Sequence, residues 1–497
     1  MRRTAMARAP VVAAIDLGSN SFHLVIAQVR DGAPAIVDRA REMLRFGSAL
    51  DHQGRIRPES AKSALLCLKR FGTHLALWRP QLVRAVGTNT LRVATGAEGF
   101  LVRAENRLGV PISVISGVEE ARLIYRGVSR VLAENDRVLL IDIGGGSTEL
   151  IVGVGYAPQV LESVGIGSVT LTDGIFAGHL LTQARFAQAV KVAKSRLMAA
   201  RASVQGTDWT RVMGSSGTIR AVENMIRDCG LAERGIRREH VDELVRRLIS
   251  QRRLDRLVMP GLATERAPVI MGGLSVLTAF MEVFSVDSMD VARGALREGI
   301  LYDLIDELQG RDVRATAVME LAARWPNPTG DLVARRAAEM AESVRAAWAL
   351  SDEDCRFLEW AAQLHESGDA IAHTQRQLHS AYIVRSADLA GFSRHQQDFL
   401  GALIELHAGR WTGSTLRVLK GLYGAGIVRL AVLLRLAVAA ERVAAAYGPL
   451  TVHLGTRGNS VHIHVVTRSG VQREAAIADL AEECAQMAKG DIRFVQD

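Results

Sequence analysis

Cysteine is scarce in this sequence, and the cysteines that occur form no recognisable pattern. The 497 residues contain four of them, far apart and without a CxxC pair, at Cys67, Cys229, Cys355 and Cys484. This spacing excludes a disulfide framework and a cysteine-based zinc site, and it is typical of a reducing compartment. We therefore expect a cytoplasmic protein.

Long apolar runs are missing as well. The N-terminal residues MRRTAMARAP place arginines before an apolar segment, but that segment ends at Ile15 because Asp16 follows it. It is too short for the apolar part of a secretory signal, and no other stretch approaches the length of a membrane span. The sequence therefore predicts no integral membrane segment.

Lysine accounts for 6 of the 61 basic residues, so 55 arginines carry the net charge of +8. A codon bias of the source genome would produce the same imbalance. The functional interpretation is affinity for a polyanion, because a basic surface concentrates phosphate-bearing ligands. Charge alone does not distinguish nucleic acid from nucleotide or polyphosphate, but the chain carries no nucleic-acid recognition motif, and we predict no nucleic-acid partner.

The length of the chain and its changes in pattern predict several domains. Up to about residue 305, helical stretches such as 59–77 and 183–203 alternate with strand-like runs at 11–15, 22–29, 83–86, 112–115, 138–143 and 149–154. Helical segments rich in Ala, Leu and Arg dominate from about 312 to 440, and strand-like alternation returns after Pro449. The fold class predicted is α/β, followed by an all-α domain and a small α/β domain.

The most informative feature is an internal repeat. The segments AAIDLGSNSFHLVIAQV (13–29) and LLIDIGGGSTELIVGV (139–154) align without a gap, so that Asp16 matches Asp142 and His23 matches Glu149. Each copy is a strand, an Asp-x-Gly step, a turn of small residues ending in Ser, and a second strand. Two copies predict two similar lobes that present their turns to a shared cleft.

The turns have the composition of phosphate-binding loops. Glycine lets backbone N–H groups approach an anion, and successive amides form a concave anion site. We expect phosphate to contact Gly18, Ser19, Asn20, Ser21, Gly144, Gly145, Gly146 and Ser147, and also Ser216, Gly217 and Thr218 at the start of a predicted helix. Mg²⁺ prefers carboxylates and phosphate oxygens, and the candidate ligands are Asp142, then Glu149 and Asp16.

Six motifs occur along the chain in the order of one known family: DLGSNSFHLVIA, VGTNTLR, ISGVEEARLIYRGV, IDIGGGSTEL, GSSGT and GALREG. This set resembles the exopolyphosphatase and guanosine pentaphosphate phosphohydrolase family, which belongs to the actin, sugar-kinase and heat-shock-chaperone superfamily. The resemblance implies two actin-like (ribonuclease H-like) lobes at 1–125 and 126–308, with the active site between them. It also implies a helical HD-like domain at 309–440, a small α/β domain at 441–497 and a homodimer.

The HD-like domain departs from the metal-binding pattern of HD hydrolases. Their His-Asp pair is replaced by His365 and Glu366, and no histidine occurs between residues 311 and 364. His373, His379 and His407 do not complete a metal set. We predict a degenerate domain that serves packing, dimer contacts or polyanion binding.

Two neighbouring glutamates are predicted to have different roles, one structural and one catalytic. The spacing of Ser116 and Glu119 is that of a capping box, in which Glu119 returns to the Ser116 backbone N–H, and Gly127 would end the helix. Glu120 is rotated by about 100° from Glu119 and has no local partner. The resemblance assigns the water-activating base to this element, and the capping argument selects Glu120.

Two arginine motifs receive different interpretations. Arg92 ends GTNTLR and is expected to bind phosphate through its guanidinium fork. Arg297 and Glu298 in GALREG could form an ion pair between the lobes, so they are left outside the predicted site. Arg293 stands where related sequences often carry an acid, which puts a metal or substrate role of that position in doubt.

The reaction predicted is hydrolysis of a phosphoanhydride by Mg²⁺-assisted attack of water. The glycine triplet and the basic charge favour a processive exopolyphosphatase acting on inorganic polyphosphate. The alternative is removal of the 5′ phosphate of guanosine pentaphosphate. A sugar kinase would need an adenosine pocket and a sugar-binding base, whereas an actin-like nucleotide-binding scaffold would hydrolyse ATP slowly. Steady phosphate release from polyphosphate without nucleotide would exclude the scaffold.

Overall fold

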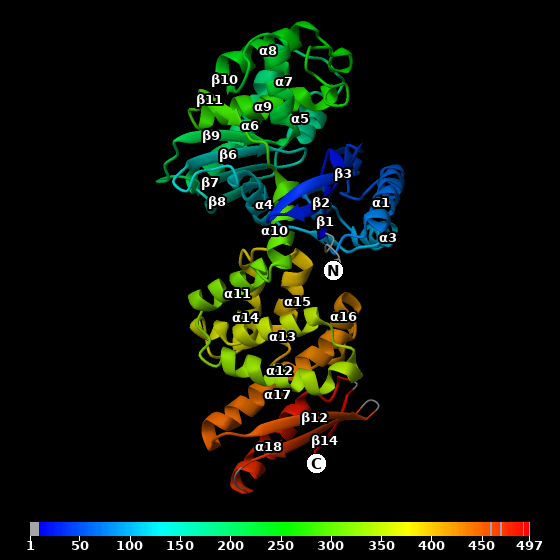
Figure 1. The fold of residues 1–497 in the computed structure, drawn as a ribbon, viewed down its shortest axis with the longest axis vertical. Coiled ribbons are helices and arrows are strands. Elements are labelled where there is room, and N and C mark those ends of the chain that lie inside the picture. The colour runs from blue at the N-terminus through cyan, green and yellow to red at the C-terminus, as the bar shows by residue number, and fades with distance from the viewer. Residues whose placement is uncertain (1–8, 458–459, 468–469, 491, 497) are drawn as a thin grey trace, which may run out of the picture. The chain divides into compact units, whose positions relative to one another are not determined.

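The computed structural model describes residues 9–457, 460–467, 470–490 and 492–496. It comprises two compact units, one ending at Asp312 and the other beginning at Val313, and Figure 1 labels their elements. Within the described residues, no single helix is long and apolar enough to cross a membrane. The helices α16 (Gly413–Tyr423) and α17 (Gly426–Tyr447), bent by 119° at their junction, meet the length and composition criteria as a pair.

The first sheet has five strands in the order β3-β2-β1-β4-β5. Alternate residues of β1 and β2 point to opposite faces: Ile15 and Leu24 pack with α1 and α3, whereas Ala14 and Val25 pack with α4 and α10. Both faces are therefore buried. The elements of this lobe are β1 (Val11–Leu17), β2 (Ser21–Arg30), β3 (Ala33–Met43), η1 (Phe46–Ala49), α1 (Pro58–Trp78), β4 (Leu82–Gly87), α2 (Asn89–Val93), α3 (Glu98–Leu108), β5 (Ile112–Val114) and α4 (Gly117–Ser129).

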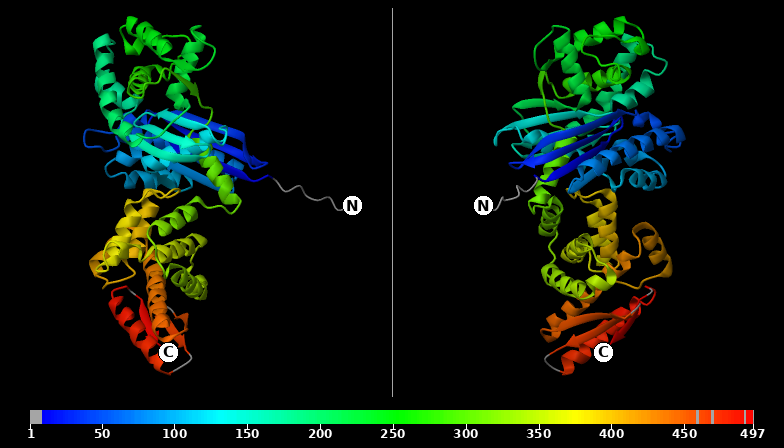
Figure 2. Two further views of the ribbon diagram at one scale, coloured as in Figure 1. Left: turned by 90° about the vertical axis from the view of Figure 1, so that its left-hand side faces the viewer. Right: turned by 45° about the vertical axis from the view of Figure 1, so that its right-hand side comes forward.

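The second sheet has six strands in the order β10-β11-β9-β6-β7-β8. Its β6–β7 hairpin repeats β1–β2: Asp142 lies opposite Glu149, as Asp16 lies opposite His23. In both views of Figure 2 the strands of the two sheets, coloured blue and cyan, lie next to each other. The elements are β6 (Arg137–Ile143), β7 (Thr148–Val154), β8 (Ala157–Val164), α5 (Ser168–Ile175), α6 (Gln183–Ser203), β9 (Arg211–Ser215), α7 (Ser216–Asp228), β10 (Ile236–Arg237), α8 (Arg238–Ser250), η2 (Leu254–Arg256), η3 (Ala267–Val269), α9 (Ile270–Val283) and β11 (Ser288–Val291).

The chain returns to the first lobe after the second sheet. Helix α10 (Leu296–Leu308) packs against α4 and β1, although the range 126–308 assigns it to the second lobe. The residue bounds of the two lobes stay a prediction.

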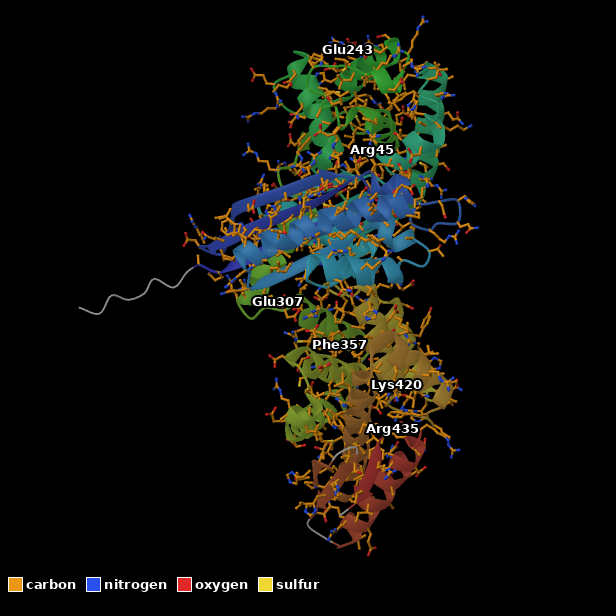
Figure 3. All side chains as sticks on the ribbon, turned by 90° about the vertical axis from the view of Figure 1, so that its right-hand side faces the viewer. Arg45, Glu243, Glu307, Phe357, Lys420 and Arg435 are labelled. Atoms are coloured by element: carbon orange, nitrogen blue, oxygen red, sulfur yellow. The ribbon has the colours of Figure 1, made fainter. Side chains whose placement is uncertain are left out.

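The second unit is helical up to Tyr447 and then forms a sheet of order β12-β13-β14. Phe357, labelled in Figure 3, packs edge-to-face against Trp360 and Phe392 in the helical core. Helices followed by a small sheet confirm the fold class predicted for this half. The elements are α11 (Val313–Arg324), α12 (Gly330–Trp348), α13 (Asp352–Leu364), η4 (Ser367–Ala370), α14 (Arg376–Ser386), α15 (Arg394–Glu405), α16, α17, β12 (Thr451–Arg457), β13 (Ser460–Val466), α18 (Gly470–Gln486) and β14 (Arg493–Gln496).

Two histidines of the HD-like region are buried in this helical core. The Nδ1 atoms of His365 and His407 lie 2.7 and 2.6 Å from the carbonyl oxygens of Ala362 and Ile404. Their rings pack edge-to-face with centroids 5.0 Å apart, and burial lowers the pKa of both. Nowhere in the described ranges do three or more His, Cys, Asp or Glu side chains gather closely enough to hold a metal ion.

The predicted strand runs coincide with β1, β2 and β4 to β7, and the predicted helix 183–203 coincides with α6. The sequence patterns missed the short strands β10 and β11 and the longer strands β3 and β8. The two longer strands carry charged or polar residues on half-exposed faces, so that strong apolar alternation is lost. Each nevertheless pairs with the second strand of its hairpin and widens the sheet at one edge.

Candidate active site

The turns after β1 and β6 face each other in one cleft of the first unit. A side chain at Gly146 would overlap Asn89 and approach Ser19 of the opposite turn, and one at Gly145 would press on Ser19 and Asn20. Glycine is thus required because the two turns come so close. The cleft lining contains these predicted residues: Asp16, Gly18, Ser19, Asn20, Ser21, Glu120, Asp142, Gly144, Gly145, Gly146, Ser147, Ser216 and Gly217.

Three predicted site residues do not contribute to this lining in the described part of the chain. Arg92 donates from Nη1 to Glu120 Oε2 (3.2 Å) and to the Ile115 carbonyl oxygen (3.0 Å). Glu149 is buried, and its Oε1 accepts a bond from Ser163 Oγ (2.9 Å). Thr218 is buried in the first turn of α7, where its backbone N–H donates to Ser216 Oγ (3.1 Å). In the structure Arg92 contacts Glu120, and the phosphate contact predicted for Arg92 stays a prediction.

Glu120 is presented to the cleft by the first turn of α4. Ser116 is the N-cap of this helix, and its Oγ accepts the Glu119 backbone N–H (3.1 Å). Burial raises the pKa of Glu120 to about 7; the Arg92 charge opposes this rise, and the negative charges of Asp16 and Asp142 add to it. A carboxyl group with a pKa near neutrality is suited to general-base catalysis.

The second half of the predicted capping box is wrong. The Glu119 carboxylate accepts two bonds from Arg122, at 2.7 and 2.8 Å, because a charged partner one turn along the helix compensates a buried carboxylate better than a backbone N–H does. Helix α4 also continues past Gly127 to Ser129. Gly127 is required for close packing instead, since a side chain there would overlap the Ala295 carbonyl oxygen.

Asp16 and Asp142 lie at the cleft ends of β1 and β6. Burial raises the pKa of Asp16 to about 6, with Arg297 opposing the rise and Asp142 adding to it. Burial likewise raises the pKa of Asp142, whose Oδ2 accepts a bond from Ser215. Asp16 Oδ1 is buried and finds no hydrogen-bond partner among the residues that the structure describes. Two desolvated carboxylates beside the two glycine-rich turns fit Mg²⁺, which is commonly held by one or two carboxylates, substrate phosphates and water.

Glu149 fits a ligand role less well than the two aspartates. It does not contribute to the cleft lining in the described residues, and its side chain is directed to Ser163. Burial, together with the charges of Glu120 and Asp142, raises its pKa well above the ordinary value.

Three arginines that the sequence patterns did not select also line the cleft: Arg220, Arg266 and Arg297. Burial and the neighbouring arginines lower the pKa of Arg220, and they lower that of Arg266 to about 10. Arginines that lower one another's pKa in this way are stabilised in their charged form when an anion binds beside them. They come from α7, the loop before α9 and the start of α10, and only the GALREG motif marked one of them in advance.

Arg297 contacts His23 across the cleft, not Glu298. Its Nη1 donates to His23 Nδ1, so His23 Nε2 carries the proton and donates to Ser21 Oγ (2.7 Å). Burial and Arg297 lower the pKa of His23 to about 2, which keeps the imidazole neutral. Glu298 Oε2 accepts the Ala295 backbone N–H (3.0 Å) and caps α10. The ion pair considered for Arg297 and Glu298 is therefore wrong.

A second pocket adjoins the cleft and shares its three arginines. Arg39, Arg41 and Arg293 bring the arginines in its lining to six, while Glu265 and Glu298 add carboxylates. Arg293 thus belongs to an anion-attracting surface. The pocket also runs along apolar residues of β2, α7 and the loop before α9, namely Leu24, Ala221 and Ala263.

Comparisons with known proteins match both units. The model of the Ppx/GppA phosphatase family matches residues 25–308, and the model of domain III of the same phosphatases matches residues 313–483. A guanosine-5′-triphosphate,3′-diphosphate pyrophosphatase from Vibrio campbellii is 35% identical over 433 residues, or 86% of each chain. The enzyme of that name from Vibrio atlanticus is 36% identical over 439 residues, covering 86% of this chain and 87% of the relative.

Solved structures agree with these matches. An exopolyphosphatase-like protein is 26% identical with a TM-score of 0.56, covering 61% of this chain and 99% of that one. An exopolyphosphatase from Cytophaga hutchinsonii is 25% identical with a TM-score of 0.55, covering 60% and 98%. The family resemblance and the actin-like fold class expected from the motifs are confirmed. The chain belongs to the Ppx/GppA phosphatase family, whose chemistry is the hydrolysis of phosphoanhydrides.

Proposed function

We propose that the protein removes the terminal 5′ phosphate of guanosine pentaphosphate and leaves guanosine tetraphosphate. The observation that carries this proposal is the likeness to enzymes named guanosine-5′-triphosphate,3′-diphosphate pyrophosphatase, at 35–36% identity over 86% of this chain. It replaces the preference for polyphosphate drawn from the sequence. That preference rested on the glycine triplet and the basic charge, which suit the phosphates of either substrate.

The turns and the three cleft arginines would bind the 5′ triphosphate end. Backbone N–H groups of the Gly18–Ser21 and Gly144–Ser147 turns supply donors that need no reorganisation during the reaction. Arg220, Arg266 and Arg297 add charge where negative charge accumulates on the transferred phosphoryl group. Neutral His23 fixes the Arg297 guanidinium without competing for the anion.

Asp16 and Asp142 are the residues that would hold Mg²⁺, with Glu149 supporting them from behind. Bound Mg²⁺ would neutralise phosphate charge and polarise the phosphorus–oxygen bond. The lack of a hydrogen-bond partner for Asp16 Oδ1 in the described part of the chain supports this assignment. Ser215 holds Asp142 at one oxygen and leaves the other for the cleft.

Glu120 is proposed as the general base. Its carboxylate accepts a proton from water while the water oxygen forms a bond to the terminal phosphorus, and the bond from that phosphorus to the bridging oxygen breaks. Burial provides the raised pKa that this step needs. Arg92 keeps enough of the carboxylate ionised near neutral pH, because its charge opposes the effect of burial.

The arginine-rich pocket supports a nucleotide over a uniform polyphosphate chain. It offers a second anion-binding region beside the cleft together with apolar residues, and guanosine pentaphosphate carries a second phosphate group and a nucleoside. Inorganic polyphosphate has no apolar part to use that lining.

Exopolyphosphatase activity remains the second candidate, favoured by the solved exopolyphosphatase of Cytophaga hutchinsonii. The test is a comparison of kcat/KM for guanosine pentaphosphate and for long polyphosphate under Mg²⁺. We expect the higher value for the nucleotide, and a higher value for polyphosphate would overturn the proposal. An actin-like scaffold would show no steady phosphate release from either. The homodimer and the cytoplasmic location remain predictions.

A further inference from the structure

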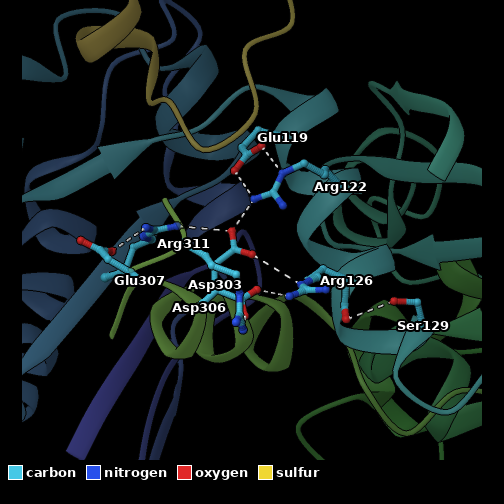
Figure 4. A network of polar contacts seen from close by, with 9 residues as sticks. Glu119, Arg122, Arg126, Ser129, Asp303, Asp306, Glu307 and Arg311 are labelled. Carbon is cyan, nitrogen blue, oxygen red and sulfur yellow. Dashed lines mark hydrogen bonds and ion pairs between the residues drawn. The ribbon is translucent and has the colours of Figure 1, made fainter. Parts of the chain in front are cut away.

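A network of buried ion pairs joins α4 to α10, and Figure 4 draws its residues. Arg122 lies between Glu119 of its own helix and Asp303 of α10 and bonds to both carboxylates. Asp303 also faces Arg84 (3.5 Å) and Arg126 (3.7 Å). The Glu119 and Asp303 side chains are 5% and 3% exposed, respectively, so water screens these charges weakly.

This network lies next to groups that face the substrate. Glu119 directly precedes Glu120, which lines the cleft, and the start of α10 contributes Ala295, Leu296 and Arg297 to the same lining. Holding α4 on α10 therefore fixes the distance between the predicted base and a phosphate-binding arginine.

The helices are also close enough for their position to be well defined. A side chain at Gly299 would overlap the Leu123 carbonyl oxygen, and one at Gly294 would overlap that of Gly127. Glycine contacts fix the separation of two helices but resist sliding of one helix along the other only weakly. The bidentate Arg122–Glu119 pair and the bond from Arg122 to Asp303 resist that sliding, because a guanidinium group binds carboxylates in few orientations.

We propose that Arg122 and Asp303 are positioning residues for the hydrolysis: they turn the Glu119 carboxylate away from the cleft and hold the first turn of α4 so that Glu120 faces the substrate. This inference rests on the role of Glu120 in the proposed function. Neither residue contributes to the cleft lining among the described residues, so each acts through α4.

The charges that face Glu120 come from several elements. Arg92 of α2 pairs with it, Asp16 of β1 and Asp142 of β6 act on it across the cleft, and Glu149 of β7 lies close enough for the two carboxyl groups to affect each other. Glu119 adds a further negative charge on α4, which Arg122 neutralises. Arg122 therefore pairs a buried carboxylate that would otherwise stand unpaired one residue from Glu120.

The first experiment compares Asp303→Asn with Glu307→Gln. Glu307 lies one turn further along α10 and pairs with Arg84 of β4, not with a residue of α4, so it is a matched control. With whichever phosphoanhydride the parent hydrolyses, Asp303→Asn should lower kcat about 10- to 100-fold with KM little changed, since small misplacements of a catalytic group cost that much. Glu307→Gln should stay within about twofold of the parent. Equal kcat values for the two variants would overturn the inference.

The second experiment separates positioning from loss of stability. Arg122→Met should lower kcat with KM little changed, whereas Arg122→Lys should lower kcat less, because its ammonium keeps an ion pair without the bidentate geometry. A folded Arg122→Met with the kcat of the parent would contradict the inference. If Arg122→Met does not fold, Arg122→Lys and the Asp303 and Glu307 variants decide. A parent that hydrolyses no phosphoanhydride would refute the proposed function instead.

Discussion

At the scale of residues, two identical neighbours have opposite surroundings. Glu119 faces α10 and is neutralised by Arg122, whereas Glu120 faces the cleft, where burial raises its pKa to about 7. A rotation of about 100° between successive helical residues separates the two. The sequence supports the choice of Glu120, but for a different reason from the structure, because Glu119 is held by an ion pair and not by a capping box.

Replacing the predicted base should remove turnover and leave the fold intact. Glu120→Gln keeps the shape of the side chain and removes its ability to accept a proton, so kcat should fall about 10²- to 10⁴-fold. Steady-state phosphate release measures this. The matched control is Glu98→Gln, an exposed acid in the first turn of α3, which should behave as the parent. Retained activity in Glu120→Gln would show that another residue is the base.

Arg92 allows a test between two roles. If it serves Glu120, Arg92→Met removes the charge that lowers the pKa of Glu120. That pKa then rises above about 7, and the acidic limb of the pH–kcat/KM profile moves to higher pH because the base must be deprotonated to act. If Arg92 binds phosphate, as its motif suggested, Arg92→Met raises KM and the acidic limb of the profile keeps its position. Exposed Arg103 offers the control Arg103→Met, with the same loss of charge.

At the scale of elements, the contact between α4 and α10 sets the geometry of the cleft. Each helix begins at the cleft, and glycines at 127, 294 and 299 let their backbones touch. Helical periodicity does not predict this contact between the two helices, because Arg122 and Asp303 are 181 positions apart in the chain. The GALREG motif indicates that a helix start is special without showing which helix it meets.

The glycine contact makes a further prediction. Gly299→Ala should lower the melting temperature and kcat together, because the added methyl group would push Leu123 and the first turn of α4 away from α10. Gly99→Ala in α3 is the matched control: it adds a methyl group in open space within a helix. It should be neutral or stabilise by up to about 1 kcal/mol. Thermal unfolding and initial rates of both variants provide the comparison. Equal melting temperatures and equal rates for the two variants would contradict the role given to the contact between α4 and α10.

At the scale of the whole molecule, local patterns predicted the hairpins and their loops, and tertiary contacts decided the rest. The Asp-x-Gly turns could be predicted from the sequence because glycine spacing and apolar strands are local signals. The arginine cluster could not be predicted, because Arg220, Arg266 and Arg297 come from separate segments and are three among 55 arginines. Arg92 was selected by its motif, but the motif does not show that its guanidinium contacts Glu120.

The cleft carboxylates also predict how stability depends on pH and Mg²⁺. Burial raises the pKa of Asp16 to about 6 and that of Glu120 to about 7, so the folded protein binds protons more tightly than the unfolded chain does. This contribution to stability is complete below about pH 4 and is lost as the pH rises towards 7. Mg²⁺ would replace those protons, so it should raise the melting temperature more at pH 8 than at pH 5.

The control for that experiment is the double variant Asp16→Asn, Asp142→Asn, in which Mg²⁺ should no longer change the melting temperature at either pH. An equal rise in the parent and in the double variant would place the metal away from these two carboxylates.

The most direct test of the whole account follows the oxygen atom of the attacking water. Guanosine pentaphosphate is hydrolysed in water labelled with oxygen-18 under Mg²⁺, and the products are analysed by mass spectrometry. The account predicts labelled orthophosphate and unlabelled guanosine tetraphosphate from the parent, with turnover nearly abolished in Glu120→Gln. Label in the nucleotide, release of pyrophosphate, or undiminished turnover in the variant would contradict it.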